Sequence, residues 1–505
     1  MTNNASAQQD RSGVGSEATC ANTTNASGGR ARYSNYIHWA LWLILAVASL
    51  RSVYVLINGA QLLHLPFEST KPEAFILHGI QRIAQHEPLY QPLGEMPFIV
   101  HVYNPLTYVL PGLAGRMFDL DSPHMLLVGR YISYLSTLIL GVLLAVWVKR
   151  TTGDWKSALL AGLGIFYFHA VALTDFFRCR PESPGLLFTF SGVIMLLSAW
   201  RWRAPASAVL FFLAFLYKQS FIAAPISAAA FFLLAKQYRH ALTFSLTIAG
   251  LLMAFCIIMY RTTQERYFQN AVVALAVNDV RPIESAATVY GKPLVQALYG
   301  LLPAVPLAVS VLIAGKNQFY LIIYFFVCLG WSFYSAGKIG AQANYYAEFA
   351  VLSLVIVALA AGSREWQRRP IVLAMLGLLA SQALIGIAHH GILGERIPVA
   401  GKDVTPYVER YKQVFGSKLI THEEIAIHLG EIVGLDWVLL EHLAEKRRID
   451  LSSIFRQISK GAYAMVILNQ HVATRLEMRI LYAVKEGPYK LAYFDDTVSE
   501  WVPAR

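Results

Sequence analysis

The stretch MLLVGRYISYLSTLILGVLLAVW, residues 125–147, decides the fold class of this chain. It contains one charged side chain, Arg130. As an α-helix it would be about 34 Å long, which is enough to cross the roughly 30 Å hydrocarbon core of a bilayer. Lys149 and Arg150 follow directly, and basic residues collect at the cytoplasmic ends of such helices. The stretch therefore predicts a membrane-spanning helix that ends in the cytoplasm.

The composition of the whole chain of 505 residues agrees with a lipid environment. Hydrophobic residues make up 56% of it and charged residues only 14%, whereas soluble domains carry about 25% charged residues. The net charge of +11 is divided into short clusters between apolar runs, which follows the positive-inside rule and argues against a nucleic-acid partner. The four cysteines have no metal-type spacing, so we expect neither a disulfide framework nor a zinc site.

Apolar runs of spanning length recur along the chain, so we expect about 10–12 spans. Together they predict an all-α polytopic membrane domain over 36–388, after a disordered cytoplasmic tail at 1–35. The run Ala206–Ala235 is too long for one helix and predicts two short helices with a polar apex at Lys218. Tyr103–Phe118 is shorter and either crosses or lies at the interface. The other runs are Ile37–Ile57, Ala158–Phe176, Gly185–Trp200, Ala241–Tyr260, Leu294–Ala314, Phe319–Tyr334, Tyr345–Ala361 and Ile371–Ala388.

The basic and acidic clusters between these runs alternate from one side of the membrane to the other, provided that Tyr103–Phe118 does not cross. The alternation predicts a multi-pass protein of the inner (plasma) membrane with a cytoplasmic N-terminus. Residues 398–505 then form an extracytoplasmic domain, and their composition is that of a small soluble α/β domain. Its expected helices are Glu423–Leu429, Trp437–Lys446, Ile454–Ser459 and Arg475–Val484, and its expected strands are Ala464–Leu468 and Leu491–Phe494.

The first outer loop, residues 59–104, is too polar to span the membrane and too long for a simple connection. Apolar residues recur at helical spacing after Pro72, which predicts an amphipathic helix lying along the membrane surface. Glu73 falls in the first turn of that helix, where the helix dipole favours a carboxylate. By charge alone, Glu73 is better explained as a solvated first-turn acid than as a catalytic one.

Two more polar clusters lie at the same outer boundary. Arg178, Arg180 and Glu182 lie between two apolar runs, where such groups either pair, line a polar cavity or snorkel to the interface. A loop of small residues from Gly337 to Glu348 carries Lys338 and Asn344. Lysine suits a phosphate as a point charge, although each of these residues could also serve as an interface anchor.

An arginine within a membrane span is costly, so Arg130 is by default a functional candidate, while snorkelling explains Arg51 almost as well. The acid pair in Asp119-Leu120-Asp121 is better explained by a turn than by a metal site. The sequence shows no nucleotide-binding loop, no nucleophile elbow and no internal repeat.

Several motifs, in order, resemble those of bacterial GT-C glycosyltransferases, the polytopic enzymes related to protein mannosyltransferases and lipopolysaccharide sugar transferases. The resemblance covers about Glu68 to Glu348. The motifs that carry it are Pro72-Glu73-Ala74, Glu87-Pro88-Leu89-Tyr90, Tyr103-Asn104-Pro105-Leu106, Gly129-Arg130-Tyr131-Ile132-Ser133, Arg180-Pro181-Glu182, Leu216-Tyr217-Lys218-Gln219, and Gly337-Lys338 with Asn344-Tyr345 and Glu348.

The resemblance implies an inverting hexosyl or pentosyl transferase that moves a sugar from a polyprenyl-phosphate donor to an envelope acceptor on the outer membrane face. Such a reaction needs a carboxylate to take the acceptor proton and cations to stabilise the leaving phosphate. Glu73 is then the candidate general base, and Glu182 is the second catalytic candidate, which would orient an arginine, bind the acceptor or hold a metal. The phosphate candidates are Arg178, Arg180, Lys218 and Lys338, and the acceptor or structural polar candidates are Asn344, Glu348 and Tyr103. No metal ligand is assigned, and a divalent metal is left open as a cofactor.

Two other functions stay open at this stage. A membrane transporter would carry inverted repeats and broken helices near the membrane midplane. A non-catalytic scaffold for envelope assembly would use its tail domain to bind a partner and would not need Glu73.

Overall fold

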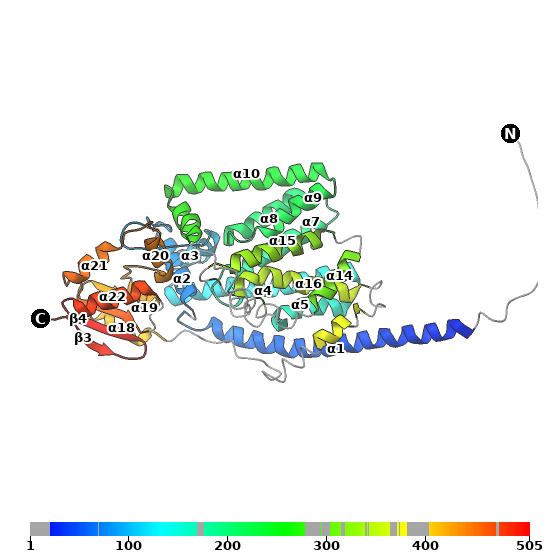
Figure 1. Cartoon of the computed structure of the whole chain (residues 1–505), viewed down its shortest axis with the longest axis horizontal. Helices are drawn as coiled ribbons and strands as arrows, with labels where there is room; N and C mark the ends of the chain where they lie inside the picture. Colours follow the sequence, from blue (N-terminus) through cyan, green and yellow to red (C-terminus); the bar gives the residue numbers. More distant parts are fainter. Residues whose placement is uncertain are drawn as a thin grey trace, which may run out of the picture.

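The computed structural model describes residues 21–68, 70–168, 176–277, 294, 304–314, 319–338, 341, 343–363, 371–372, 374–380, 403–470 and 474–504. These residues form a helical bundle with a small domain at one end of its long axis (Figure 1). The bundle and the small domain correspond to the membrane region and the C-terminal α/β domain that the sequence predicts.

Within the described residues, five helices are long and apolar enough to cross a membrane. They lie in α1 (Ala21–Leu63, apolar from His38), α4 (Ser122–Thr152), α10 (Tyr238–Thr263), α15 (Phe319–Ala336) and α16 (Ala347–Gly362, spanning from Asn344). Shorter apolar helices accompany them: α5 (Trp155–Phe168), α7 (Glu182–Leu197), α8 (Arg203–Tyr217), α9 (Ala223–Leu234) and α14 (Val305–Ala314). The predicted split of Ala206–Ala235 into two helices around Lys218 is confirmed by α8 and α9.

Helix α16 forms the centre of the bundle. All of its residues are buried, and it packs against α4, α5, α14 and α15. Helices α1 and α10, in contrast to the buried α16, run along the two outer sides of the bundle (Figure 1). Only 11% of the most apolar stretch of α10 is buried. Its Leu, Ile and Met side chains therefore face the surroundings, as a lipid-exposed helix requires.

Helix α2 (Lys71–Ala84) is the amphipathic helix predicted from residues 72–83. Its apolar stripe, which includes Ile76, Leu77 and Ile80, is fully buried and packs against α3 (Leu106–Met117). Helix α3 has 12 residues, which gives a length of about 18 Å, shorter than the roughly 30 Å hydrocarbon core of a bilayer. This length favours the alternative in which Tyr103–Phe118 lies at the interface.

The C-terminal domain contains a four-stranded sheet between two layers of helices. The strand order is β1 (Lys418–Ile420), β2 (Met465–Asn469), β4 (Val498–Pro503) and β3 (Tyr489–Phe494), with β1 parallel to β2 and the other pairs antiparallel. Alternate residues of β2 enter opposite layers, with Val466 on one face and Ile467 on the other. The first layer holds α20 (Trp437–Glu445), α21 (Ser452–Ser459) and α22 (Arg475–Glu486), and the second holds α18 (Thr405–Lys412) and α19 (Glu423–Leu429).

The first outer loop contributes to the core of the C-terminal domain. Phe98 is buried against Trp437 within one apolar cluster. Its backbone N–H donates to the carbonyl of Val433 at 2.9 Å, and the N–H of Leu435 donates back to its carbonyl at 2.9 Å. The loop and the C-terminal domain therefore fold as one packed unit, although 300 residues separate them in the sequence.

Helix α1 begins at Ala21, within the segment 1–35 for which the sequence predicts a disordered tail. No proline interrupts the chain between Ala21 and the apolar run, and extending an existing helix costs far less than starting one. Most of the expected run Ile371–Ala388 and the first half of Leu294–Ala314 lie outside the described residues.

Candidate functional site

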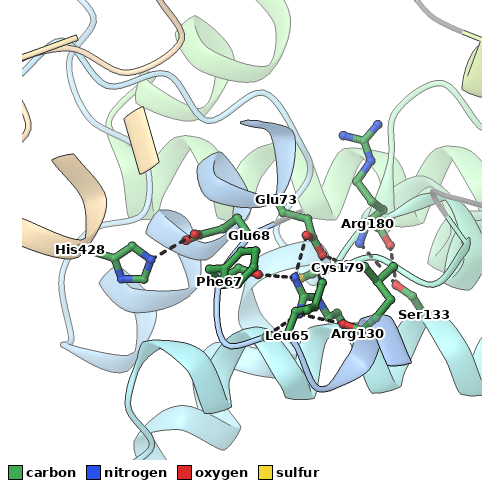
Figure 2. A network of polar contacts seen from close by, with 10 residues as sticks. Leu65, Phe67, Glu68, Glu73, Arg130, Ser133, Cys179, Arg180 and His428 are labelled. Carbon is green, nitrogen blue, oxygen red and sulfur yellow. Dashed lines mark hydrogen bonds and ion pairs between the residues drawn. The ribbon is translucent and has the colours of Figure 1, made fainter. Parts of the chain in front are cut away.

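Glu73 forms a fully buried ion pair with Arg130. The Nε of Arg130 donates to Oε1 of Glu73 at 3.0 Å, and its Nη2 donates to Oε2 at 2.9 Å (Figure 2). Both side chains are completely inaccessible to solvent. The pair joins the first turn of α2 to α4, and its two parallel hydrogen bonds fix the relative position of these helices.

The remaining donors of Arg130 hold the chain that leads into α2. Its Nη1 donates to the carbonyls of Leu62 and Leu65, and its Nη2 donates to that of Phe67 at 2.8 Å. Glu73 in turn accepts a hydrogen bond from the backbone N–H of Cys179 at 2.8 Å. By charge alone the sequence suggested a solvated Glu73, whereas the structure encloses its carboxylate among these partners.

The segment that follows Cys179 connects this pair to a second polar cluster. The carbonyl of Arg180 accepts from Oγ of Ser133 at 3.0 Å, while its side chain points away from Glu73 (Figure 2). At the other end, Nε of Arg180 lies 3.6 Å from Oε2 of Glu182. Residues 179–182 therefore lie directly between the Glu73–Arg130 pair and the Glu182 carboxylate.

Glu182 is the centre of the second cluster. Its Oε1 accepts from Nζ of Lys218 at 2.8 Å and from Nδ2 of Asn344 at 2.8 Å. All three side chains are at most 9% exposed. Glu182 occupies the first turn of α7, and Lys218 directly follows the last residue of α8. Since these neighbouring helices are antiparallel, a carboxylate at one helix N-terminus meets a cation at the adjacent C-terminus, as the helix dipoles favour.

Aromatic rings enclose the ammonium group of Lys218. Its Nζ lies 4.8 Å from the ring centre of Tyr345 and 5.9 Å from that of Tyr103. Nearby, Glu348 accepts a hydrogen bond from the hydroxyl of Tyr324 at 2.6 Å. The predicted residues Arg180, Glu182, Lys218, Asn344 and Tyr103 thus come together from four separate parts of the chain, with Glu348 in the same cavity wall.

A small cavity runs along this cluster. Its lining includes Glu182, Lys218, Asn344, Tyr345 and Glu348, and its volume is about 20 Å³, which is room for about one water molecule. The Oδ1 atom of Asn344 is buried there and accepts no hydrogen bond from the part of the chain that the structure describes. A sugar or phosphate would therefore enter only if these side chains separate.

The structure places the other predicted residues as follows. Arg178 is buried just before Cys179, and Lys338 lies beyond the end of α15, with Nζ 5.7 Å from the ring of Tyr334. Within the described ranges, no group of three or more His, Cys, Asp or Glu side chains is arranged to hold a metal ion. Asp121 caps α4 by accepting from the N–H of His124 at 3.0 Å, so the acid pair at 119–121 belongs to a turn.

The sequence marks Arg130 as a functional candidate but does not indicate its contact with Glu73, and it assigns no site role to Tyr345 or Tyr324. The pairing of Arg130 with Glu73 joins residues 57 positions apart, and no periodicity reports such a contact. Tyr345 could have been found, because it directly follows Asn344 in the small-residue loop. Tyr324 could not, since it falls within an apolar run that otherwise predicts only a buried span.

Comparison with known proteins identifies the fold. No protein-family model and no curated protein matches the chain in sequence. Among solved structures, the chain is similar to ArnT from Cupriavidus metallidurans bound to undecaprenyl phosphate, with a TM-score of 0.61 and 11% identity over 91% of this chain and 97% of that one. The apo structure of the same ArnT gives a TM-score of 0.60 and 11% identity over 89% and 97%. ArnT is a GT-C glycosyltransferase, and the chain is therefore a multi-pass membrane protein with the GT-C fold.

Proposed function

We propose that the protein is a glycosyltransferase that moves a sugar from a polyprenyl-phosphate donor to an envelope acceptor, with inversion, on the outer face of the inner membrane. The observation that carries the proposal is the buried Glu182–Lys218–Asn344 cluster in a fold shared with ArnT, which binds undecaprenyl phosphate. Buried charged groups in a membrane protein are expensive, and they persist where they serve a ligand or a reaction.

The cluster supplies the two kinds of group that the reaction needs. Lys218 and Arg180 are cations that both contact the Glu182 carboxylate, and a donor phosphate can take the place of that carboxylate. Release of Lys218 toward the phosphate would leave Oε1 of Glu182 with Asn344 as its hydrogen-bond donor and open a second acceptor position for the proton of the acceptor hydroxyl. Donor binding would in this way prepare the general base, and the cations would stabilise the charge that develops on the leaving phosphate.

Glu73, which the family resemblance suggests as the general base, takes a positioning role in this proposal, and Glu182 takes the role of the base. To act as a base it would have to leave Arg130, and breaking a buried pair typically costs about 3–5 kcal/mol. While paired, it holds the N–H of Cys179, and this fixes the segment that carries Arg180 and Glu182. Arg178 and Lys338 complete the proposed phosphate-binding residues, and Glu348 and Tyr103 complete the wall on the acceptor side.

The test is transfer of labelled sugar from polyprenyl-phosphate donors by membranes that contain the protein, beside binding of undecaprenyl phosphate to the purified chain. We expect saturable binding and donor-dependent transfer. A purified protein that binds no polyprenyl phosphate and consumes no such donor would refute the proposal.

A further inference from the structure

A second, larger cavity lies on the far stretch of α2, between that helix and the C-terminal domain. Its volume is about 430 Å³, within the 300–1,000 Å³ typical of small-molecule sites. Residues of α2 form one wall, and the last turn of α19 with the following Gly430 forms the other. The polar side chains of the lining are His78, Gln81, Arg82, Gln85, Glu87, Ser122 and His428.

The polar wall is held in place before any ligand arrives. Nε2 of Gln81 donates to Oγ of Ser122 at 2.8 Å. Arg82 is fixed twice, by an ion pair with Glu87 at 2.8 Å and by a hydrogen bond from its Nε to the carbonyl of Pro88 at 2.8 Å. The ring of His78 stacks on that of His101 with centroids 5.2 Å apart. Such prior order lowers the entropy that ligand binding costs.

The charges of the lining cancel one another locally. Arg82 is matched by Glu87, and His428 is matched by Glu68 at 3.0 Å. Burial lowers the pKa of His78 to about 3, and the nearby charge of Arg82 acts in the same direction, so this imidazole is neutral. The cavity therefore presents many hydrogen-bond donors and acceptors without a net charge that would select a phosphate.

Apolar side chains complete the lining. Ile99, Ile427 and Ile432 offer surface for C–H groups. A pocket that combines amide, guanidinium, imidazole and hydroxyl groups with a modest apolar wall fits a compact ligand covered with hydroxyl groups. We propose that this cavity binds a neutral saccharide unit.

The position of the cavity relates it to the proposed reaction. Gln85 follows Glu73 by twelve residues along α2, which corresponds to about 18 Å, and Glu73 holds the segment that carries the proposed base Glu182. A short glycan could bridge that distance, so the saccharide would be part of the acceptor; this assignment to the acceptor rests on the proposed function, whereas saccharide binding itself does not.

The chain provides a matched pair of variants for the test. Gln85 ends α2 with φ −85° and ψ 7°, and Gln413 ends α18 with φ −81° and ψ −10°. Both are exposed, but only Gln85 lines the cavity. Gln85→Trp places an indole in the cavity, and Gln413→Trp is its control. Gln85→Ala is a milder variant that removes the amide without adding bulk.

The experiment measures binding of methyl glycosides and short neutral oligosaccharides to the purified full chain by saturation-transfer NMR, with glucose 1-phosphate and inorganic phosphate as charged probes. We expect neutral saccharides to bind, Gln85→Trp to weaken them at least tenfold, Gln85→Ala to weaken them by a smaller factor, and Gln413→Trp to leave them unchanged. Undecaprenyl phosphate binding should stay at the wild-type level in all three variants.

Three results would overturn the inference: no neutral saccharide binds the wild type, only the phosphorylated probes bind, or binding survives both Gln85 substitutions in folded protein. Failure of the proposed function is separate, because it appears as loss of undecaprenyl phosphate binding or of donor consumption by the wild type. Saccharide binding without donor consumption would keep the cavity and reject only its assignment to an acceptor.

Discussion

The carboxylate of Glu73 and the guanidinium of Arg130 meet through two parallel hydrogen bonds in a site with no solvent exposure. Each charge is stable there only because of the other, since an isolated buried ion would carry a desolvation penalty of several kcal/mol. Arg130 also donates hydrogen bonds to three backbone carbonyls, and Glu73 accepts one from a backbone N–H. It therefore organises the junction of α1, α2 and α4, which lies directly beside the segment bearing Arg180 and Glu182.

Removal of Arg130 should destabilise the protein strongly. Arg130→Met leaves the Glu73 carboxylate buried without its partner, and such a change typically costs about 3–5 kcal/mol. Arg150→Met is the matched control, because Arg150 lies in the exposed last turn of the same helix. Unfolding in mixed micelles with increasing SDS measures the stability of both variants. Equal stability of the two variants would contradict the role given to the pair.

The contact between the C-terminal domain and α2 should weaken as the pH rises. Burial raises the pKa of Glu423 to about 7, against the opposing charge of Lys71, which lies 3.2 Å away. Burial lowers the pKa of His428, but the hydrogen bond and charge of Glu68 outweigh it and leave the pKa raised. A group whose folded pKa is raised stabilises the fold at low pH, and that contribution disappears as the pH passes its folded pKa.

Both groups have this sign, whereas the lowered pKa of His78 has the opposite one, so we expect the contribution of Glu423 and His428 to the domain contact to be larger at pH 6 than at pH 8.5. The change in stability that Glu423 alone contributes between these two pH values is on the order of 1 kcal/mol. Hydrogen exchange of residues 403–470 at the two pH values measures it, with the intrinsic exchange rate corrected for pH. Glu423→Gln imitates the protonated side chain and should reduce the dependence. Contact that strengthens at pH 8.5 would show that the sign is wrong.

The sequence predicted the described membrane helices and the tail-domain helices α19 to α22, because periodicity and hydropathy indicate burial, but it did not predict α18. Even the break at Lys218 was visible, since three polar residues interrupt an apolar run. The missed strands β1 and β4 have a physical explanation. Strand β1 has three residues and begins with Lys418, and β4 ends at Pro503, so neither shows the alternation by which strands are recognised.

The candidate site was predictable only as a set of residue types at one membrane boundary. Arg180, Glu182, Lys218 and Asn344 were singled out, but their mutual contacts depend on how α7, α8 and the turn before α16 pack. Glu73 shows most clearly why the contacts of a site residue could not be predicted from the sequence. An acid in the first turn of an amphipathic helix has the same sequence pattern whether it faces solvent or pairs with an arginine 57 residues later.

The orientation in the membrane can be tested with two single cysteines. Phe415 is 94% exposed in the C-terminal domain, and Arg150 lies at the predicted cytoplasmic end of α4. A membrane-impermeant maleimide should label Phe415→Cys in intact spheroplasts, and Arg150→Cys only after lysis, each counted above the labelling of the parent chain. The reverse pattern would place the C-terminal domain in the cytoplasm.

The division of roles in the proposed reaction gives the last prediction. Glu182→Gln keeps the size of the side chain and a hydrogen-bond acceptor for Lys218, but it removes the base. Turnover should fall by about a hundredfold to ten-thousandfold, while undecaprenyl phosphate should bind at least as well as to the wild type, because Lys218 no longer has a competing carboxylate. Lys218→Met removes the cation and should weaken both binding and turnover, since a phosphate contact acts in the ground state and the transition state alike.

Glu73→Gln should lower the stability of the protein, and it should lower turnover only indirectly, by displacing the segment that carries Arg180. Labelled-sugar transfer, binding of undecaprenyl phosphate and thermal melting, measured on all three variants, separate these effects. Wild-type turnover in Glu182→Gln would exclude Glu182 as the base, and a Glu73→Gln protein of normal stability without turnover would return that role to Glu73.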